Sequence, residues 1–185
     1  MMTEISLNIL DVAENSTRAG ASLVTILVSV NTSTDELTVQ LSDDGCGMTK
    51  EQLEHVTDPF FTTRQTRKVG LGIPFFKYAA ESTGGSFSIE SKPGIGTKTT
   101  AVFGLSHIDR MPLGDMNSTI QTLITCHPDT DFLYIYRYNE ASFELDTRLF
   151  REILGEIPFD SPEVAAYIKE YLFENKLETD GGAVI

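Results

Sequence analysis

The stretch that decides the fold is Leu-Ser-Asp-Asp-Gly-Cys-Gly-Met, at residues 41–48. It ends an apolar run and places the carboxylate of Asp43 two residues before a Gly-x-Gly pair, Gly45 and Gly47. A carboxylate at the end of a strand can accept a hydrogen bond from a buried donor such as an exocyclic amine. Glycines beside it let the backbone approach a flat ring or a phosphate closely. The same letters also favour an ordinary turn, so both interpretations stay open until the flanking segments are considered.

The composition is that of a globular protein. The chain has 185 residues, of which 41% are hydrophobic and 22% are charged, enough for one sizeable core or one domain with an appendage. No apolar run approaches the ~18 residues that a membrane helix needs, and the start does not read as a signal peptide. Two cysteines do not suggest a disulfide framework. We therefore expect a cytoplasmic protein without membrane contact.

The charge is strongly acidic, with a formal net value of −13. Such a field disfavours non-specific binding to nucleic acid. An acidic protein that binds a polyanion must build a local positive site, and the dense basic cluster is residues 64–68. It contains three of the fourteen basic residues of the chain, Arg64, Arg67 and Lys68.

The segment before the central stretch reads as a helix over residues 3–19, with Thr3 as its cap and Gly20 as its stop. This helix places Asp11 and Asn15 one turn apart, on the same face. A solvated polar face is the common alternative. Because the pair borders the apolar face, we interpret it as suited to a cleft.

The elements around these motifs predict a two-layer sandwich. A hairpin delivers Asp43 at its end, and a capping box of Thr49 and Gln52 starts a short helix. Gly70 and Gly72 open another helix, whose free amides can hold a phosphate. Residues 1–108 are therefore expected to form an α/β (α+β) domain with a mixed, mainly antiparallel sheet and helices on one face. The predicted strands are 21–30, 37–41, 86–91 and 98–107, and the predicted helices are 3–19, 49–56 and 71–82.

Residues 109–185 contain no further group of residues typical of a catalytic or binding site. They are expected to form a C-terminal α/β extension or small domain. An aromatic strand is predicted at 132–138 and frayed residues at 179–185. His127 is interpreted as a loop residue rather than a catalytic one. The role of this segment stays open between extending the sheet edge and supplying a docking surface. Its predicted helices are 117–126, 147–154 and 162–174.

Taken together, these motifs resemble the ATP-binding domain of the gyrase, heat-shock-90, histidine-kinase and MutL (GHKL) superfamily, the Bergerat fold. Residues 11–16, Asp-Val-Ala-Glu-Asn-Ser, are similar to its Glu-x-x-x-Asn signature and closest to the MutL branch. The resemblance implies that Asn15 coordinates Mg²⁺ at the phosphates and that Asp11 occupies the general-base position. Asp11 stands where hydrolytic members have glutamate, which puts efficient hydrolysis in doubt.

The central stretch matches the Asp-x-Gly-x-Gly box of that family. The resemblance implies that Asp43 accepts the adenine amino group, that Gly45 and Gly47 allow close packing along the ring, and that Met48 is also a nucleotide-binding residue. Adenine is then selected over guanine, which carries a carbonyl at that position. Thr97, in a Gly-Thr step, is expected to contact adenine directly or through water.

The segment Asp-Pro-Phe-Phe-Thr-Thr-Arg at residues 58–64 resembles the phenylalanine box of sensor histidine kinases. Gly70-Leu71-Gly72 is like the kinase glycine box, with Lys68 where its leading glycine would stand. The basic cluster thus falls where triphosphate charge must be neutralised. The nucleotide-binding residues expected from these two boxes are Phe61, Thr62, Arg64, Lys68, Gly70, Leu71 and Gly72.

Two classes of active function remain open, beside a third interpretation as a nucleotide-sensing module without turnover. A free-standing histidine-kinase-like domain, which phosphorylates a separate protein, is favoured by the phenylalanine box and by the absence of an upstream phosphoacceptor helix pair. An ATPase or ATP-switched binding module without phosphotransfer is the alternative, favoured by the MutL-like helix. In both cases we expect Mg-ATP, a protein partner, a possible homodimer and no nucleic acid.

Overall fold

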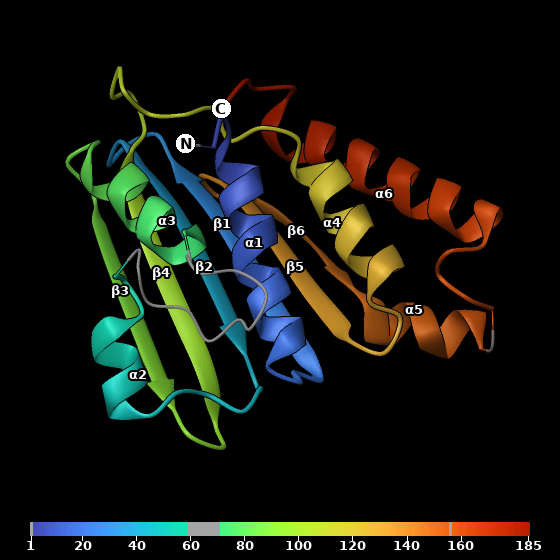
Figure 1. The fold of residues 1–185 in the computed structure, drawn as a ribbon. Helices are drawn as coiled ribbons and strands as arrows, with labels where there is room; N and C mark the ends of the chain where they lie inside the picture. Colours follow the sequence, from blue (N-terminus) through green and yellow to red (C-terminus); the bar gives the residue numbers. More distant parts are fainter. Residues whose placement is uncertain (1, 59–70, 156) are drawn as a thin grey trace.

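The computed structural model describes residues 2–58, 71–155 and 157–185. Within these ranges the strands form one sheet in the order β3-β4-β2-β1-β5-β6, with helices packed against it (Figure 1). The strands are β1 Leu23–Asn31, β2 Glu36–Asp43, β3 Ser86–Lys92, β4 Gly96–Gly104, β5 Asp131–Tyr138 and β6 Ala141–Asp146. The helices are α1 Ile5–Arg18, α2 Lys50–His55, α3 Gly72–Glu81, α4 Met116–Cys126, α5 Thr147–Leu154 and α6 Pro162–Asp180.

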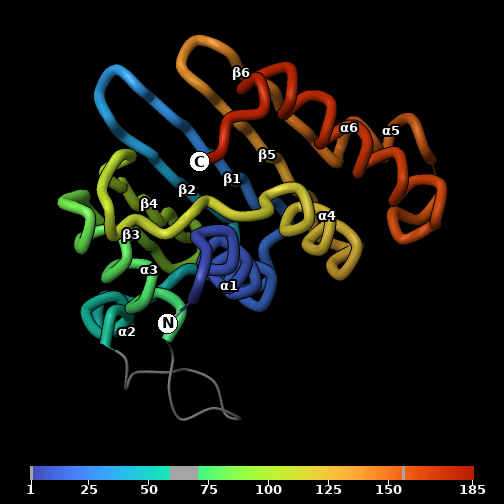
Figure 2. The backbone as a smooth tube through the Cα atoms, turned by 90° about the horizontal axis from the view of Figure 1, so that it is seen from above, coloured from blue at the N-terminus to red at the C-terminus, as the bar shows by residue number. Residues whose placement is uncertain are grey.

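The sheet is mixed and mainly antiparallel. Each neighbouring pair of strands runs antiparallel except β1 and β5, which are parallel. Figure 2 shows the helices gathered on one side of the sheet. The predicted two-layer α/β sandwich is therefore confirmed.

The core lies between the sheet and α1. Side chains of a strand point alternately to its two faces, and in β1 every second residue is fully buried, as at Val24, Ile26 and Val28. The positions between them are only half-buried. On α1, Ile5 and Ile9 are fully buried and meet this face of the sheet. One face of the sheet thus carries the core, and the other is partly open to solvent.

The start of α1 differs from the prediction. The helix begins at Ile5 with Glu4 at the N-cap, and no side chain caps it. The backbone amides of Ile5 and Ser6 instead donate to the carbonyls of Pro112 and Leu113, at 3.0 and 2.8 Å. The prediction of Thr3 as the cap is wrong, because residues from the middle of the chain satisfy the amides that a cap would satisfy.

The C-terminal segment continues the same sheet. Strand β5 pairs with β1, and β6, which the sequence did not predict, pairs with β5. The expected fraying of residues 179–185 is wrong, since α6 runs to Asp180, which is buried. The carbonyl of Ile185 also accepts a bond of 2.8 Å from the amide of Leu113. The division of the chain at residue 108 stays a prediction.

In the described ranges no helix is both long and apolar enough to cross a membrane.

Candidate functional site

A cavity of about 550 Å³ lies between α1, α3 and the ends of β2 and β4. This volume falls in the range of pockets that bind small ligands. Eight of the residues predicted from the sequence line it: Asp11, Asn15, Asp43, Gly47, Met48, Leu71, Gly72 and Thr97. The chain thus brings its separate motifs together around one pocket.

Asp43 ends β2 and is fixed by donors from three directions. Its Oδ1 accepts from the backbone amides of Gly45 and Thr97, at 3.0 and 3.2 Å. Its Oδ2 accepts from the hydroxyl of Ser16, on α1, at 2.6 Å. A carboxylate held in this way keeps one orientation, with lone pairs left over for a ligand donor. The arrangement is suited to reading an amino group on a flat ring.

Asp44, the neighbouring carboxylate, has a structural role instead. It accepts hydrogen bonds from the hydroxyl and amide of Ser22 and from the amide of Leu23. The bond from the Ser22 hydroxyl, followed by that from the Leu23 amide, holds the pKa of Asp44 below its ordinary value. Asp44 thereby ties the turn to the start of β1 and leaves Asp43 to face the pocket.

The glycines of the turn allow close backbone approach. Gly47 has φ +66°, and a Cβ there would collide with the carbonyl oxygen of Lys92. A Cβ at Gly45 would lie 2.9 Å from the Cβ of Ala19. Gly45 does not line the pocket itself, but it lets the turn pack on the end of α1, where the amide of Cys46 donates to the Ala19 carbonyl at 2.9 Å.

Ser91, which the sequence motifs did not single out, joins Met48 and Thr97. Its hydroxyl accepts from the amide of Met48 at 2.8 Å and lies 2.8 Å from the hydroxyl of Thr97. It therefore fixes Thr97 at the pocket wall. Thr99, buried two residues further along β4, also lines the pocket.

Asp11 and Asn15 line the opposite wall, and Asp11 lies against the start of α3. A Cβ at Gly72 would collide with the Asp11 carboxylate, so a larger residue at this position would displace that side chain. No side chain caps α3 at Leu71. The amide end of a helix favours negative charge, which suits both a carboxylate and a phosphate at this position.

Arg18, on the last turn of α1, was missed by the sequence analysis. Its guanidinium donates to the Oδ1 of Asn15 at 2.8 Å and lies 3.5 Å from the Oε2 of Glu14. Among the described residues that line the pocket, it is the sole cationic side chain. Its spacing of three residues from Asn15 places both on one helix face, a signal that the sequence did contain.

His127 follows α4 as its C-cap and contacts α1. Its Nε2 lies 2.8 Å from the Oε1 of Glu14. It lies outside helix and strand, as predicted, and it also links the C-terminal segment to the residue beside Asn15.

The remaining predicted residues lie outside the described ranges. These are Phe61, Thr62, Arg64, Lys68 and Gly70. Their roles stay predictions.

The side-chain oxygens of Asn15 and Asp11, on one wall of the pocket, fit a magnesium ion carried by a nucleotide. Amide and carboxylate oxygens, as in Asn15 and Asp11, are the hard ligands that Mg²⁺ prefers. In the part of the chain that the structure describes, no group of three or more His, Cys, Asp or Glu could hold a metal by itself. Mg²⁺ commonly takes one or two protein oxygens and completes its shell with phosphate and water. The residues present fit that pattern.

Comparison with known proteins now identifies the family. The sequence profile of the "Histidine kinase-, DNA gyrase B-, and HSP90-like ATPase" family matches residues 1–107, more than half of the chain. The chain belongs to this GHKL ATPase family. Membership supports ATP as the ligand of the pocket.

Individual relatives match parts of the GHKL domain. Sporulation kinase E of Bacillus subtilis is 36% identical over 63 residues, which cover 34% of this chain and 8% of that protein. The sensor histidine kinase DcuS of Escherichia coli is 34% identical over 59 residues, covering 32% of this chain and 11% of that protein. The matched segments are thus a small share of these relatives' length.

The fold has a solved counterpart in the N-terminal domain of a DNA repair protein. The TM-score is 0.55 at 12% sequence identity, over 78% of this chain and 52% of that chain. At this identity the likeness concerns the GHKL fold alone.

Proposed function

We propose that this domain binds Mg-ATP in the described pocket and transfers the γ-phosphoryl group to a side chain of a partner protein. The printed names of two relatives, a sporulation kinase and a sensor histidine kinase, support phosphotransfer. The fixed orientation of Asp43 is the observation that carries the nucleotide assignment.

In this proposal the two walls of the pocket divide the ligand between them. The adenine amino group donates to Asp43 at one end, and Thr97 makes a second polar contact with the base. The phosphates then extend toward Asn15, Arg18 and the start of α3. Mg²⁺, when bound, would neutralise phosphate charge. Asn15 would hold it through its Oδ1, in place of the Arg18 guanidinium that this oxygen accepts from in the structure.

Positioning is the main contribution of the protein to phosphoryl transfer. A nucleophilic side chain of the partner attacks the γ-phosphorus in line with the bond to the bridging oxygen of ADP. That bond breaks, and ADP carries away the electron pair. Asp11, with its carboxylate at the pocket wall beside Gly72, is placed to orient the attacking group and to accept its proton.

Hydrolysis, or a nucleotide-dependent change of partner binding, is the second candidate. Residues 11–16 resemble the MutL branch, and Asp11 is placed to orient a water molecule in the same way as a hydroxyl. A water molecule would then replace the partner as the nucleophile. The two candidates share one pocket and differ in the acceptor.

Incubation with γ-labelled ATP separates these functions. We expect protein-bound label when the domain is mixed with its partner, acid-labile for a phosphohistidine and acid-stable for a phosphoserine or phosphothreonine. If the labelled phosphate is released only as inorganic phosphate, with every partner tried, phosphotransfer is overturned in favour of hydrolysis. The Asp43→Ala variant serves as the control for copurified kinases, because its label should vanish.

A further inference from the structure

The outer side of α5 and α6 exposes an unusual number of large apolar side chains. Half of the large hydrophobic residues exposed in the described ranges lie within residues 149–177. They include Ile153, which is 84% exposed, and Phe173, which is 62% exposed. Single exposed apolar residues are ordinary, but a concentration of them marks an interaction surface. The six are Leu149, Ile153, Ile157, Tyr167, Phe173 and Leu177.

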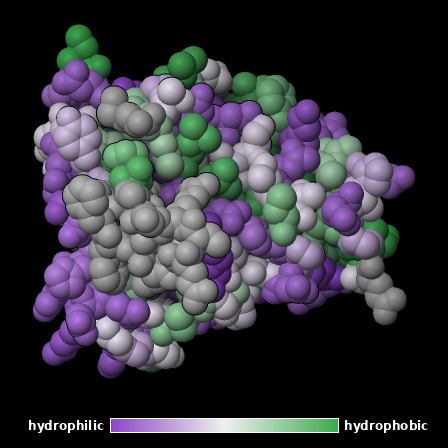
Figure 3. All heavy atoms as spheres, in the orientation of Figure 1, coloured by the Kyte–Doolittle hydropathy of each residue, from purple (hydrophilic) through white to green (hydrophobic). Residues whose placement is uncertain are grey.

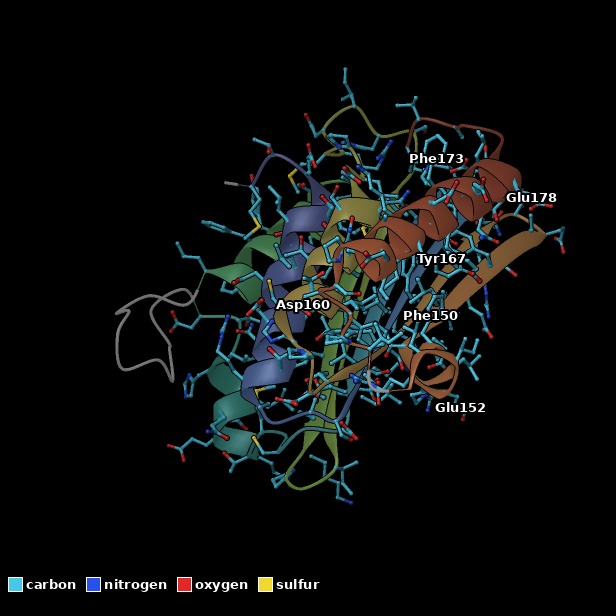
Figure 4. The ribbon with its side chains drawn as sticks, turned by 90° about the vertical axis from the view of Figure 1, so that its right-hand side faces the viewer. Phe150, Glu152, Asp160, Tyr167, Phe173 and Glu178 are labelled. Atoms are coloured by element: carbon cyan, nitrogen blue, oxygen red, sulfur yellow. The ribbon has the colours of Figure 1, made fainter. Side chains whose placement is uncertain are left out.

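An aromatic cluster joins the two helices within this surface. The ring of Phe150, on α5, lies 5.9 Å from that of Tyr167 and 5.6 Å from that of Tyr171, both on α6. Tyr171 is anchored by a hydrogen bond of 2.9 Å from its hydroxyl to the carbonyl of Glu144. Figure 4 shows Phe150 and Tyr167 on the same side of the molecule as Phe173. Tyr167 is therefore an ordered aromatic side chain that remains 56% exposed, as an interface anchor would be.

A row of acidic residues runs beside these apolar side chains. Glu170, Glu174 and Glu178 are exposed and spaced by four residues, so they lie along one side of α6. Like charges at this spacing disfavour a helix. Glu178 also lies in the last turn of α6, where the helix dipole disfavours negative charge. The row therefore lowers the folding stability of the unbound chain. A role in binding a partner would account for its presence.

The basic residues of the two helices are largely engaged elsewhere. Arg148 pairs with Asp146 at 2.7 Å, Arg151 with Asp131 at 2.7 Å and Lys176 with Asp180 at 2.6 Å. Each of these acidic partners lies outside the row. Among the residues that the structure describes, Glu170, Glu174 and Glu178 form no ion pair. Its negative charge is thus available to a partner.

We propose that this α5–α6 surface docks a segment of a partner protein in which apolar side chains are flanked by lysine or arginine. The surface is defined by Leu149, Ile153, Tyr167, Phe173 and Leu177 together with Glu152, Glu170, Glu174 and Glu178. Figure 3 shows hydrophilic and hydrophobic side chains interspersed over α5 and α6. Apolar anchors supply binding energy, and the acidic row selects a basic partner and speeds its encounter.

Charge argues against other occupants. Nucleic acids and anionic membrane surfaces would be repelled by the acidic row. If a second copy of the chain paired with the first through a two-fold axis at α6, the acidic rows of the two copies would face and repel each other. The surface also lies away from the nucleotide pocket, with α6 and α2 at opposite sides of the molecule (Figure 1).

A synthetic helical peptide of leucine and lysine, labelled with fluorescein, tests the charge and apolar requirements together. With the whole chain we expect saturable binding by fluorescence anisotropy, weakening as sodium chloride is raised. A matched peptide with glutamate in place of lysine should not bind. Equal binding of both peptides would overturn the proposal.

Variants locate the binding surface. The double change Ile153→Ser with Phe173→Ser should weaken lysine-peptide binding by about tenfold or more, as expected for the loss of two anchors. Neutralising the row with Glu170→Gln and Glu174→Gln should also weaken it. Ile108→Ser, at an isoleucine that is 94% exposed outside the surface, is the matched control and should bind as the unchanged chain does. Unchanged binding by the double variant, or equal loss in the control, would contradict the proposal.

Three further measurements complete the test. Flotation with anionic phosphatidylserine vesicles should show no binding. Sedimentation should give the same oligomeric state for the unchanged chain and for Phe173→Ser. Either positive result would replace the protein partner with a membrane or a second copy. ATP binding by calorimetry should be equal in all surface variants. A failure of the nucleotide assignment is thus distinguishable from a failure of this surface.

Discussion

At the scale of single residues, Asp43 makes the sharpest prediction. Replacement by asparagine keeps the size of the side chain but substitutes an amide, which presents an NH₂ group and lacks the negative charge. We expect Asp43→Asn to weaken ATP binding by roughly 10- to 100-fold, because hydrogen bonds to charged groups contribute about 1.5–3 kcal/mol. Isothermal titration calorimetry measures the affinity. Asp129→Asn, at an exposed carboxylate outside the pocket, is the control, and equal affinity in both variants would contradict the assignment.

Asp11 separates binding from chemistry. The Asp11→Asn variant keeps the size of the side chain beside Gly72 but loses the capacity to accept a proton. We expect ATP affinity to change little and turnover to fall by about 100-fold or more, the usual contribution of a general base. Calorimetry and single-turnover assays with labelled ATP give the two quantities. Unchanged turnover would show that Asp11 has no base role.

At the scale of an element, the turn after β2 depends on glycine for two different reasons. Gly47, in the turn after β2, and Gly94, in the turn between β3 and β4, both have positive φ, +66° and +73°, but a Cβ at Gly94 meets nothing within 4 Å. Gly94→Ala should therefore lower the unfolding free energy only by the backbone strain of a left-handed alanine, about 1–2 kcal/mol. Gly47→Ala adds a collision with the Lys92 carbonyl, so we expect a larger loss together with weakened ATP binding. Urea denaturation and calorimetry measure both effects, and equal losses in the two variants would remove the steric argument.

The elements also show what the sequence can predict. The capping box of Thr49 and Gln52 is present as expected, because it depends on residues three positions apart. The motifs around Asp43 could be recognised from the sequence because each is short and local, and the structure places them around one pocket. Strand β6 was missed because it is short and rich in polar residues, and because its pairing with Leu133–Tyr138 of β5 cannot be read from its own residues. Likewise the contact between His127 and Glu14 joins residues 113 positions apart, and no local pattern encodes it.

At the scale of the whole molecule, the C-terminal segment and the GHKL domain share one sheet and one core. Strand β5 lies along β1, the partner of the strand that ends in Asp43. Residues Phe132, Tyr134 and Tyr136 of β5 are buried in the same core as α1. The end of α6 closes this core through Asp180, whose side chain is fully buried. Loosening of α6 should therefore lower the stability of the whole fold.

Asp180 gives this coupling a measurable pH dependence. Its Oδ2 accepts from the Tyr136 hydroxyl at 2.8 Å and from the Lys176 ammonium at 2.6 Å. Burial by itself raises the pKa of the Asp180 carboxyl, but the hydrogen bonds from Lys176 and Tyr136 outweigh it and leave the pKa below its ordinary value of 3.8. A carboxyl with a lowered pKa stabilises the fold above the unfolded value and loses that contribution as the pH falls through the folded value.

We therefore expect Asp180→Asn to reduce the unfolding free energy at neutral pH by about 1–3 kcal/mol. The difference from the unchanged chain should shrink as the pH falls below 3.8, because the unchanged chain then loses the same contribution. Urea denaturation between neutral and acidic pH measures this difference. Glu140→Gln, at an exposed acid in the turn between β5 and β6, should leave stability nearly unchanged at every pH. A difference for Asp180→Asn that stayed constant into strong acid would show that the buried carboxylate does not hold α6 through its charge.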